Sequence, residues 1–109
     1  MAIRSLAIFC ASSDGADPAF IESARQVGRS LAHRGIAVVY GGGRIGLMGA
    51  VADGALGAGG RVIGVIPRAM VQAERAHTGV SDLRIVDSMH ERKALMADLA
   101  DGFIALPGG

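Results

Sequence analysis

The sequence is poor in cysteine and in aromatic residues. Its one cysteine, Cys10, cannot form a disulfide framework, so we expect a reducing cytoplasmic environment. The three histidines (His33, His77 and His90) lie far apart and form no ligand cluster, so we expect no metal site. Aromatic residues make up only 4% of the chain, whereas apolar residues make up 50%. The sequence therefore predicts an aliphatic core and excludes a disordered chain.

The sequence also lacks an excess of charge and a long hydrophobic run. The formal net charge of +1 gives no reason to expect nucleic acid or a charged membrane surface as a partner. No apolar run approaches the roughly 20 residues that a membrane-spanning helix needs. Residues 1–5 lack the apolar core of a signal peptide. We therefore expect a soluble protein that stays in the cytoplasm.

Short apolar runs alternate with helical patterns along the chain. The expected strands are residues 6–10, 36–40, 61–66, 83–87 and 102–106. Helices are expected from Pro18, with Asp17 as its N-cap, over 47–58, and from a capping box at Ser88 and Glu91 to about residue 100. Residues 68–81 indicate only a short helix around 69–73 followed by a loop. Continuously apolar strands that alternate with helices predict an α/β fold, a Rossmann-like doubly wound parallel sheet.

The last residues suggest that this domain is truncated at its C-terminal side. Pro107, Gly108 and Gly109 form a turn at the end of the fifth expected strand. In open α/β sheets such turns lead into a helix, and ligands bind at that edge. We therefore interpret residues 1–109 as a single nucleotide-binding domain that is the N-terminal part of a longer one.

A glycine-rich loop follows the second expected strand. Gly41, Gly43 and Gly46 match the pattern G-x-G-x-x-G between a strand and a helix, a context in which backbone N–H groups bind phosphate. A dinucleotide cofactor is not expected, because the loop follows the second strand and no acidic residue ends the third. No Lys-Ser or Lys-Thr pair completes a nucleoside-triphosphate loop either. A mononucleotide phosphate remains, with tight strand–helix packing as the alternative role for these glycines.

One face of the last helix combines positive charge with methionine. Met89, Arg92, Lys93 and Met96 are spaced at i, i+3, i+4 and i+7, and the face starts at the carboxyl end of the fourth strand. We expect Met89 and Lys93 to contact a ligand there together with Arg92. By itself, the spacing also fits a solvated basic face with methionines that fill the core.

Five short motifs occur together in one order. They are Tyr40-Gly41-Gly42-Gly43, Gly46-Leu47-Met48-Gly49, Gly64-Val65-Ile66-Pro67, Met89-His90-Glu91-Arg92-Lys93 and Ala105-Leu106-Pro107-Gly108-Gly109. This set closely resembles the LOG ("lonely guy") family of cytokinin-activating phosphoribohydrolases. The resemblance implies a homodimeric hydrolase, without a cofactor, that splits the N-glycosidic bond of AMP or an N6-modified AMP. The products would be the free base and ribose 5-phosphate.

The resemblance also implies roles for particular residues. It makes Arg92 catalytic, and an arginine, which is always charged, suits positioning and electrostatic stabilisation better than proton donation. The phosphate would lie against the glycine loop and the terminal turn, on Gly42, Gly43, Gly46, Gly108 and Gly109. Ser12 and Ser13 either bind the nucleotide or satisfy turn backbone. The key carboxylate of the family would follow Gly109, so we expect residues 1–109 alone to be inactive.

Three other functions are alternatives to the hydrolase. A non-catalytic nucleotide or cofactor carrier, similar to the molybdenum-cofactor carriers, would keep the phosphate loop and not need the missing carboxylate. Lysine decarboxylation requires a Schiff-base lysine on pyridoxal phosphate, and the only lysine, Lys93, lies in no such motif. Single-stranded DNA binding is disfavoured because the chain has few aromatic residues for base stacking.

Overall fold

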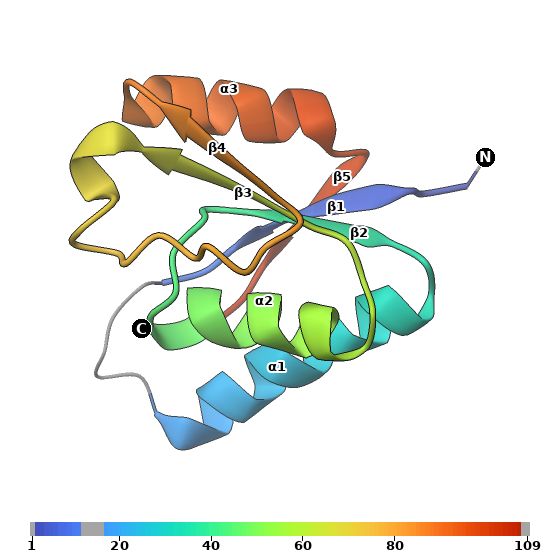
Figure 1. Cartoon of the computed structure of the whole chain (residues 1–109). Helices are drawn as coiled ribbons and strands as arrows, with labels where there is room; N and C mark the ends of the chain where they lie inside the picture. Colours follow the sequence, from blue (N-terminus) through green and yellow to red (C-terminus); the bar gives the residue numbers. More distant parts are fainter. Residues whose placement is uncertain (1, 12–16, 108–109) are drawn as a thin grey trace.

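A computed structural model describes residues 2–11 and 17–107, and it shows a parallel five-stranded sheet with helices on both faces (Figure 1). The elements in chain order are β1 (Ser5–Phe9), α1 (Pro18–His33), β2 (Ala37–Tyr40), α2 (Gly46–Gly57), β3 (Val62–Pro67), the 3₁₀ turn η1 (Arg68–Met70), β4 (Asp82–Val86), α3 (Met89–Leu99) and β5 (Gly102–Ala105). The predicted α/β class and the parallel sheet are thereby confirmed. No helix in these two ranges is long and apolar enough to cross a membrane.

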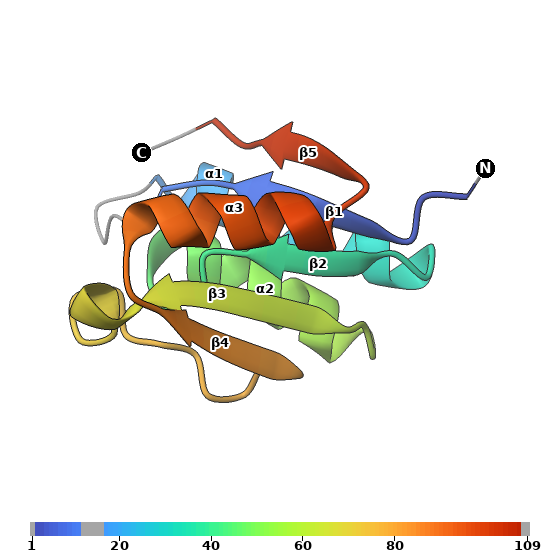
Figure 2. The same cartoon turned by 90° about the horizontal axis from the view of Figure 1, so that it is seen from above.

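The strand order is β4-β3-β2-β1-β5, with every neighbouring pair parallel. Strand β1 lies between β2 and β5, and Ala7 is in register with Val39 on one side and Phe103 on the other. After β4 the chain returns through α3, which lies across the sheet in Figure 2, and adds β5 beyond β1. The direction of strand addition therefore reverses at β1, and ligands of open α/β sheets bind at such a reversal.

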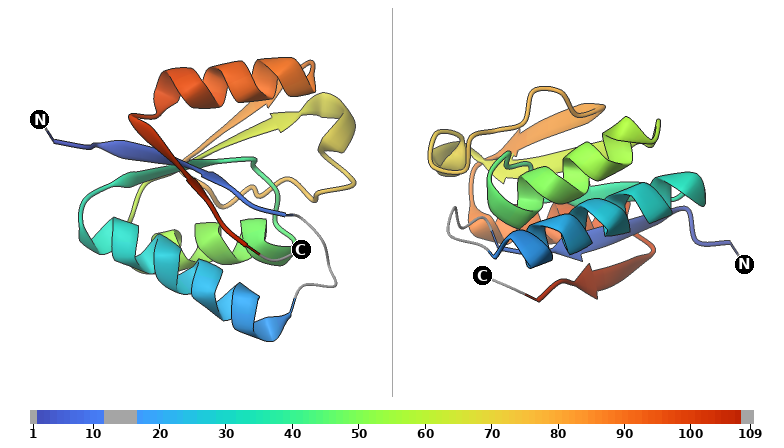
Figure 3. Two further views of the ribbon diagram at one scale, coloured as in Figure 1. Left: turned by 180° about the vertical axis from the view of Figure 1, so that it is seen from behind. Right: turned by 90° about the horizontal axis from the view of Figure 1, so that it is seen from below.

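Alternate residues of the strands bury two separate hydrophobic layers. Ile8, Val38 and Tyr40 pack toward α1 and α2, whereas Ala7 and Val39 pack toward Met96 of α3. Figure 3 shows the same division from behind and from below, with α1 and α2 together on one face. This two-sided burial explains why the strands are continuously apolar.

The two predicted helix starts at Asp17 and Ser88 are confirmed in detail. The Ala19 N–H donates to Asp17 Oδ1 at 2.8 Å, with Pro18 in the first helical turn. The Glu91 N–H donates to Ser88 Oγ at 3.1 Å. The return contact differs from the expected capping box, because Glu91 Oε2 accepts from the Asp87 N–H, one residue before the cap.

Helices α1 and α2 approach each other closely at glycines. A Cβ atom at Gly28 would lie 2.1 Å from the Val51 carbonyl oxygen, and one at Gly54 would lie 2.0 Å from the Arg25 carbonyl oxygen. Any side chain at these positions would collide with the backbone of the opposite helix. The small residues of α2 therefore allow this contact, which places α2 firmly behind the glycine loop.

Residues 68–81 differ most from the prediction. The expected short helix around 69–73 is reduced to the 3₁₀ turn η1 at Arg68–Met70, and hydrogen-bonded turns follow it. The segment of residues 71–81 passes over the glycine loop, where Gly43 and Ala76 form an isolated antiparallel bridge. Backbone pairing with a distant loop therefore replaces local helix formation here.

Candidate functional site

A cavity of about 140 Å³ opens at the carboxyl ends of β1 and β2, beneath α3. Its lining brings together residues from β1, the start of the glycine loop and two helices: Ile8, Phe9, Cys10, Gly41, Met48, Met89, Arg92, Lys93 and Met96. Most of this lining is apolar or sulfur-containing, and the positive charges come from α3. The cavity wall therefore combines apolar contacts with the positive charges of Arg92 and Lys93.

The predicted face of α3 lines this cavity. Met89, Arg92, Lys93 and Met96 all contribute to its wall. Arg92 and Met96 are buried, while Met89 and Lys93 are exposed. The spacing therefore predicted correctly which side chains meet, and their contact with a substrate stays a prediction.

Arg92 is held more tightly by the protein than the sequence suggested. Its Nε donates to the Val65 carbonyl oxygen at 3.0 Å, and its Nη2 donates to the Gly41 carbonyl oxygen. Nη2 also lies 2.6 Å from Glu74 Oε1, in an ion pair whose side chains are 7% and 13% exposed. Arg92 therefore joins β3, the glycine loop and the 71–81 segment.

These bonds change how Arg92 can meet a ligand. A guanidinium has five N–H donors, of which one lies on Nε and two on each terminal nitrogen. Three of them are directed to Val65, Gly41 and Glu74. Among the described residues, Nη1 donates a hydrogen bond only to the sulfur of Met89, at 3.7 Å. The expected two-pronged grip on phosphate or ribose oxygens is thus largely taken up by the protein, and Nη1 keeps donor capacity for a ligand.

The glycine loop is covered rather than open. Gly41, Gly42 and Gly43 are buried beneath the 71–81 segment. Two backbone hydrogen bonds hold this segment there: the Arg44 N–H donates to the Glu74 carbonyl oxygen at 2.9 Å, and the His77 N–H donates to the Gly42 carbonyl oxygen at 2.9 Å. A Cβ at Gly43 would lie 2.9 Å from Met48 Sδ and 3.0 Å from the Glu74 oxygen. Close packing is therefore one reason for these glycines, and phosphate binding stays a prediction.

Gly46 is the first residue of α2 and directly follows the glycine loop. It has a φ of +58° and is half-buried, and the preceding Ile45 offers no side-chain hydrogen bond to the helix. The first N–H groups of α2 therefore receive no side-chain cap from Ile45. This geometry is compatible with an anion at the helix start, as the sequence predicts.

Four predicted site residues lie outside the described residues. They are Ser12, Ser13, Gly108 and Gly109. Their neighbours Cys10 and Pro107 are described, and Cys10 lines the cavity. The roles of these four residues stay predictions.

Cys10 packs against the hydrophobic core and also borders the cavity. It is half-buried at the end of β1 and lines the same cavity as Arg92. Burial raises the pKa of its thiol to about 11, and the nearby Arg92 charge opposes this shift. The thiol is therefore neutral near pH 7, and it forms part of the apolar wall.

Two acidic residues without a predicted role serve the fold. Asp101 Oδ2 accepts from the backbone N–H groups of Arg4 and Ser5, which ties the start of β1 to the turn before β5. The exposed Asp87 carboxylate lies 3.7 Å from Arg68. Asp87 lies in the bend between β4 and α3.

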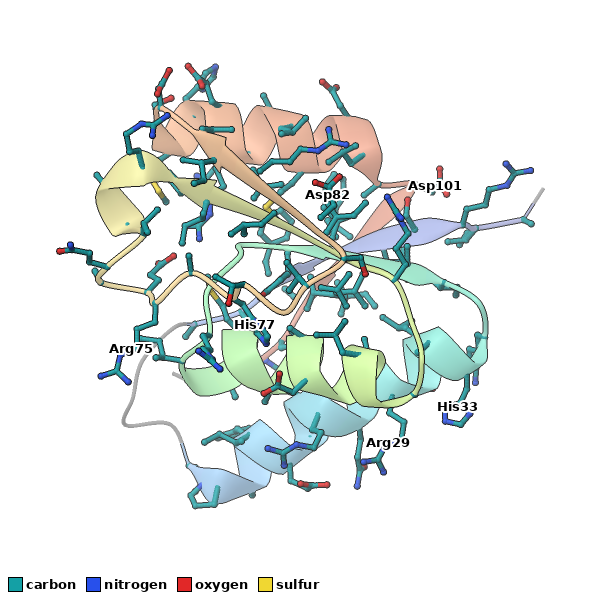
Figure 4. The ribbon with its side chains drawn as sticks, in the orientation of Figure 1. Arg29, His33, Arg75, His77, Asp82 and Asp101 are labelled. Carbon is teal, nitrogen blue, oxygen red and sulfur yellow. The ribbon has the colours of Figure 1, made fainter. Side chains whose placement is uncertain are left out.

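The structure reveals a polar network that the sequence did not predict. His77 is buried and its Nε2 lies 2.7 Å from Asp53 Oδ1 of α2, and Figure 4 shows His77 directed from the 71–81 segment toward that helix. The Tyr40 hydroxyl donates to the Gly43 oxygen at 2.7 Å, and burial raises its pKa above the usual range. The 71–81 segment shows no periodicity in the sequence, so no local signal pointed to Glu74 or His77.

The described residues contain no group of three or more histidine, cysteine or acidic side chains that could hold a metal ion. Within those residues His77 is bonded to Asp53 and to the Gly79 N–H. The chemistry available at the cavity is therefore that of a buried guanidinium, an exposed ammonium and an apolar wall.

Known proteins resemble this chain in sequence and in fold. A cytokinin riboside 5'-monophosphate phosphoribohydrolase of Rhodococcoides fascians is 47% identical over 107 residues, which are 97% of this chain and 54% of that protein. The cytokinin riboside 5'-monophosphate phosphoribohydrolase LOG of Oryza sativa subsp. japonica is 46% identical over 106 residues, 97% of this chain and 44% of that protein. The chain thus spans about half the length of the curated relatives it matches.

Solved structures support the fold. The molybdenum cofactor binding protein of Rippkaea orientalis has a TM-score of 0.80 at 22% identity, over 97% of this chain and 63% of that one. The molybdenum cofactor carrier protein of Chlamydomonas reinhardtii has a TM-score of 0.81 at 21% identity, with the same coverage. At such low identity these two structures establish the shared Rossmann-like architecture and nothing further.

The family model described as "Possible lysine decarboxylase" matches residues 48–109, which carry most of α2, the 71–81 segment and the Arg92 helix. Its match includes three of the five motifs in full, and the curated relatives extend the similarity over nearly the whole chain. The chain therefore belongs to this family, in which it groups with the LOG phosphoribohydrolases that its motifs resemble.

Proposed function

We propose that the full-length protein hydrolyses the N-glycosidic bond of AMP or an N6-substituted AMP, releasing the base and ribose 5-phosphate. The observation that carries this proposal is the apolar cavity beside the buried Arg92, at the reversal point of the sheet. Curated relatives with nearly half of their aligned residues identical are named for such a reaction. Residues 1–109 form the nucleotide-binding part of this enzyme.

Different residues of the cavity suit different parts of the nucleotide. The apolar wall, which includes Ile8 and Met48, excludes water from a purine base. Arg92 Nη1 and Lys93 supply donors and positive charge for ribose or phosphate oxygens, and the glycine loop with the start of α2 takes the phosphate. Glycosidic cleavage proceeds through an oxocarbenium-like state that carboxylates assist. We place that carboxylate in the part of the full-length protein beyond Gly109.

Lysine decarboxylation is not proposed, despite the description of the family. That reaction needs a lysine whose amine forms a Schiff base with pyridoxal phosphate. Lys93 is exposed on α3 and is the only lysine of the chain. We also infer that the protein is a homodimer, which the family resemblance supports. We infer a cytoplasmic location, which the single cysteine supports.

The test is a base-release assay on the full-length protein. We expect adenine or the N6-substituted base to appear with time from the monophosphates, and adenosine to be a poor substrate. By calorimetry AMP should bind better than adenosine by at least about 2 kcal/mol, because phosphate adds charge-assisted hydrogen bonds. Tight AMP binding without any base release would instead indicate a carrier of the molybdenum-cofactor type. Equal affinity for AMP and adenosine would show that the glycine loop does not bind the phosphate group.

Arg92→Lys tests the guanidinium directly. An ammonium cannot reproduce the planar spread of donors on Nε and Nη2 that reaches Val65, Gly41 and Glu74, so we expect kcat to fall at least about tenfold, or about 1.4 kcal/mol. Arg92→Ala is less informative, because it removes a buried partner from Glu74 and from two carbonyl groups and so destabilises the fold. Wild-type turnover in a folded Arg92→Lys variant would remove Arg92 from the mechanism.

A further inference from the structure

Met89 is the exposed methionine of the cavity wall. Met48 and Met96 line the same cavity but are only 7% and 2% exposed, whereas Met89 is 45% exposed. Of the four methionines in residues 2–11 and 17–107, Met89 is the most accessible, because the fourth, Met70, is half-buried. A small oxidant in solution therefore reaches the sulfur of Met89 before it reaches the other three.

The sulfur of Met89 contacts the one guanidinium nitrogen that has no oxygen partner among the described residues. Arg92 Nη1 donates to Met89 Sδ at 3.7 Å, whereas Nε and Nη2 donate to carbonyl and carboxylate oxygens. A thioether is a weak acceptor, so an anionic oxygen of a ligand can replace it at Nη1 with little loss. The chemical state of this sulfur therefore controls how readily Nη1 meets a ligand.

Oxidation of a thioether by a peroxide is a simple oxygen transfer. The sulfur lone pair attacks one peroxide oxygen, an S–O bond forms and the O–O bond breaks. The leaving oxygen takes up the proton of the transferred oxygen and departs as water. Sulfur thus loses two electrons, the peroxide gains two, and methionine becomes methionine sulfoxide, which cellular reductases convert back.

The sulfoxide would compete with a ligand for Arg92. Its oxygen is strongly polar, and on the Met89 sulfur it lies within reach of Nη1. Arg92 is only 6% exposed, so little water competes for its N–H groups, and a charge-assisted bond to this oxygen is strong. The bond takes up an N–H of Nη1 that a phosphate or ribose oxygen would otherwise use.

Cys10 also lines this wall, but it is the poorer target for a peroxide. The thiolate is the reactive form of cysteine, and burial raises the pKa of the Cys10 thiol to about 11. Near pH 7 the thiol therefore keeps its proton. Cys10 is also half-buried, so both its protonation and its position leave Met89 as the first group to react.

We propose that Met89 is a site of reversible oxidation, at which a peroxide produces a sulfoxide that binds Arg92 Nη1 and weakens the binding of the ligand. The effect on the ligand rests on the hydrolase function proposed above, because it takes the ligand to be a ribose phosphate. The modification itself depends only on exposure and chemistry. The cavity would thereby respond to oxidants through its one exposed sulfur among the described residues.

The first part of the experiment locates the modification. The full-length protein is treated with hydrogen peroxide at pH 7, and peptide mass spectrometry follows the addition of oxygen to each methionine. We expect Met89 to react at least about tenfold faster than Met48 and Met96, because they are buried. Equal rates at these three residues, or faster oxidation of either buried one, would overturn the proposal.

The second part measures binding of ribose 5-phosphate by calorimetry, with each protein compared with its own untreated sample. Oxidation should weaken binding by wild type at least about threefold, and methionine sulfoxide reductase should restore it. Met89→Leu, which has no sulfur to oxidise, should show no effect of peroxide. Met70→Leu is the matched control, because Met70 is not among the cavity residues, and it should respond as wild type does.

Met89→Gln provides a test that needs no oxidant. Glutamine places a carbonyl oxygen near the position of the sulfoxide oxygen, so this variant should bind ribose 5-phosphate at least about threefold more weakly than Met89→Leu. Circular dichroism confirms that both variants fold. Equal affinity of the two variants would overturn the proposed competition for Nη1.

Two further outcomes overturn the proposal. Unchanged affinity in wild type with Met89 fully oxidised would show that the sulfoxide does not occupy Nη1. An equal loss of affinity in peroxide-treated Met89→Leu would assign the effect to another group. A thiol reductant, which reverses cysteine sulfenic acid and not methionine sulfoxide, then shows whether that group is Cys10.

The two proposals fail in different ways. If the untreated protein binds ribose 5-phosphate in a peroxide-sensitive manner but releases no base from any monophosphate, the hydrolase function fails and the role of Met89 stands. If the protein releases base and peroxide changes neither binding nor turnover, only the role of Met89 fails. A protein that neither binds ribose 5-phosphate nor releases base would overturn both.

Discussion

His77 Nε2 lies 2.7 Å from Asp53 Oδ1, and this hydrogen bond ties the 71–81 segment to helix α2. The Gly79 N–H donates to His77 Nδ1 at 3.0 Å, so Nδ1 is the acceptor of the ring and Nε2 carries the hydrogen. His77 therefore holds both Gly79 of its own segment and Asp53 of the helix behind the glycine loop. Glu74 is positioned by the same segment.

His77→Ala should lower the free energy of unfolding by about 1–3 kcal/mol, because it removes two hydrogen bonds from a buried side chain. Urea denaturation of the full-length protein measures this effect. Asp53→Asn is the matched control, since an amide oxygen also accepts from Nε2. It should cost less than about 1 kcal/mol if the hydrogen bond, and not an ion pair, is what matters. Equal losses in both variants would contradict this account.

Gly28→Ala should destabilise the protein by about 1–3 kcal/mol. Alanine is the better helix former by about 1 kcal/mol, but here its Cβ would lie 2.1 Å from the Val51 carbonyl oxygen, so steric overlap decides the sign. Gly57→Ala is the matched control, because nothing lies within 4 Å of a Cβ there. Its stability should be unchanged or slightly raised. Thermal melts of both variants measure the difference, and a stabilised Gly28→Ala would disprove the close helix contact.

Cys10 should react slowly with iodoacetamide near neutral pH. Burial raises the pKa of its thiol to about 11, so the thiolate fraction and the alkylation rate should continue to increase between pH 9 and pH 11. A free thiol, with a pKa of about 8.5, should level off earlier and serves as the reference. Mass spectrometry of the labelled protein follows the reaction. Because Cys10 lines the cavity, AMP should slow its labelling, and labelling that ignores AMP would place the nucleotide elsewhere.

Phe103→Ser should reduce self-association of the 109-residue chain. Phe103 is 60% exposed on β5, an edge strand of the described sheet, and its ring lies 5.7 Å from that of Phe9. Two exposed aromatic rings beside unpaired edge groups favour contact between molecules. Sedimentation velocity should show a lower average mass for Phe103→Ser than for wild type. Phe20→Ser removes a similarly exposed ring from α1 and should leave the mass distribution unchanged.

Much of the fold was predictable because its signals are local. The apolar runs marked all five strands within one or two residues, and Asp17 and Ser88 marked two helix starts through contacts two and three residues away. The i, i+3, i+4, i+7 spacing also identified Met89, Arg92, Lys93 and Met96 as one face. Helical and strand periodicities depend on backbone geometry alone, so these features need no knowledge of distant residues.

Other features were decided by the tertiary structure alone. Glu74 and His77 lie in a segment without periodicity, and their partners Arg92 and Asp53 are 18 and 24 residues away. No local pattern encodes such pairs, because they form only when sheet order and helix packing bring the elements together. The sequence by itself thus determined the elements, the parallel sheet and the charged face of α3. Only the folded chain decided that Arg92 is clamped by Val65, Gly41 and Glu74, since those acceptors converge through packing across the sheet.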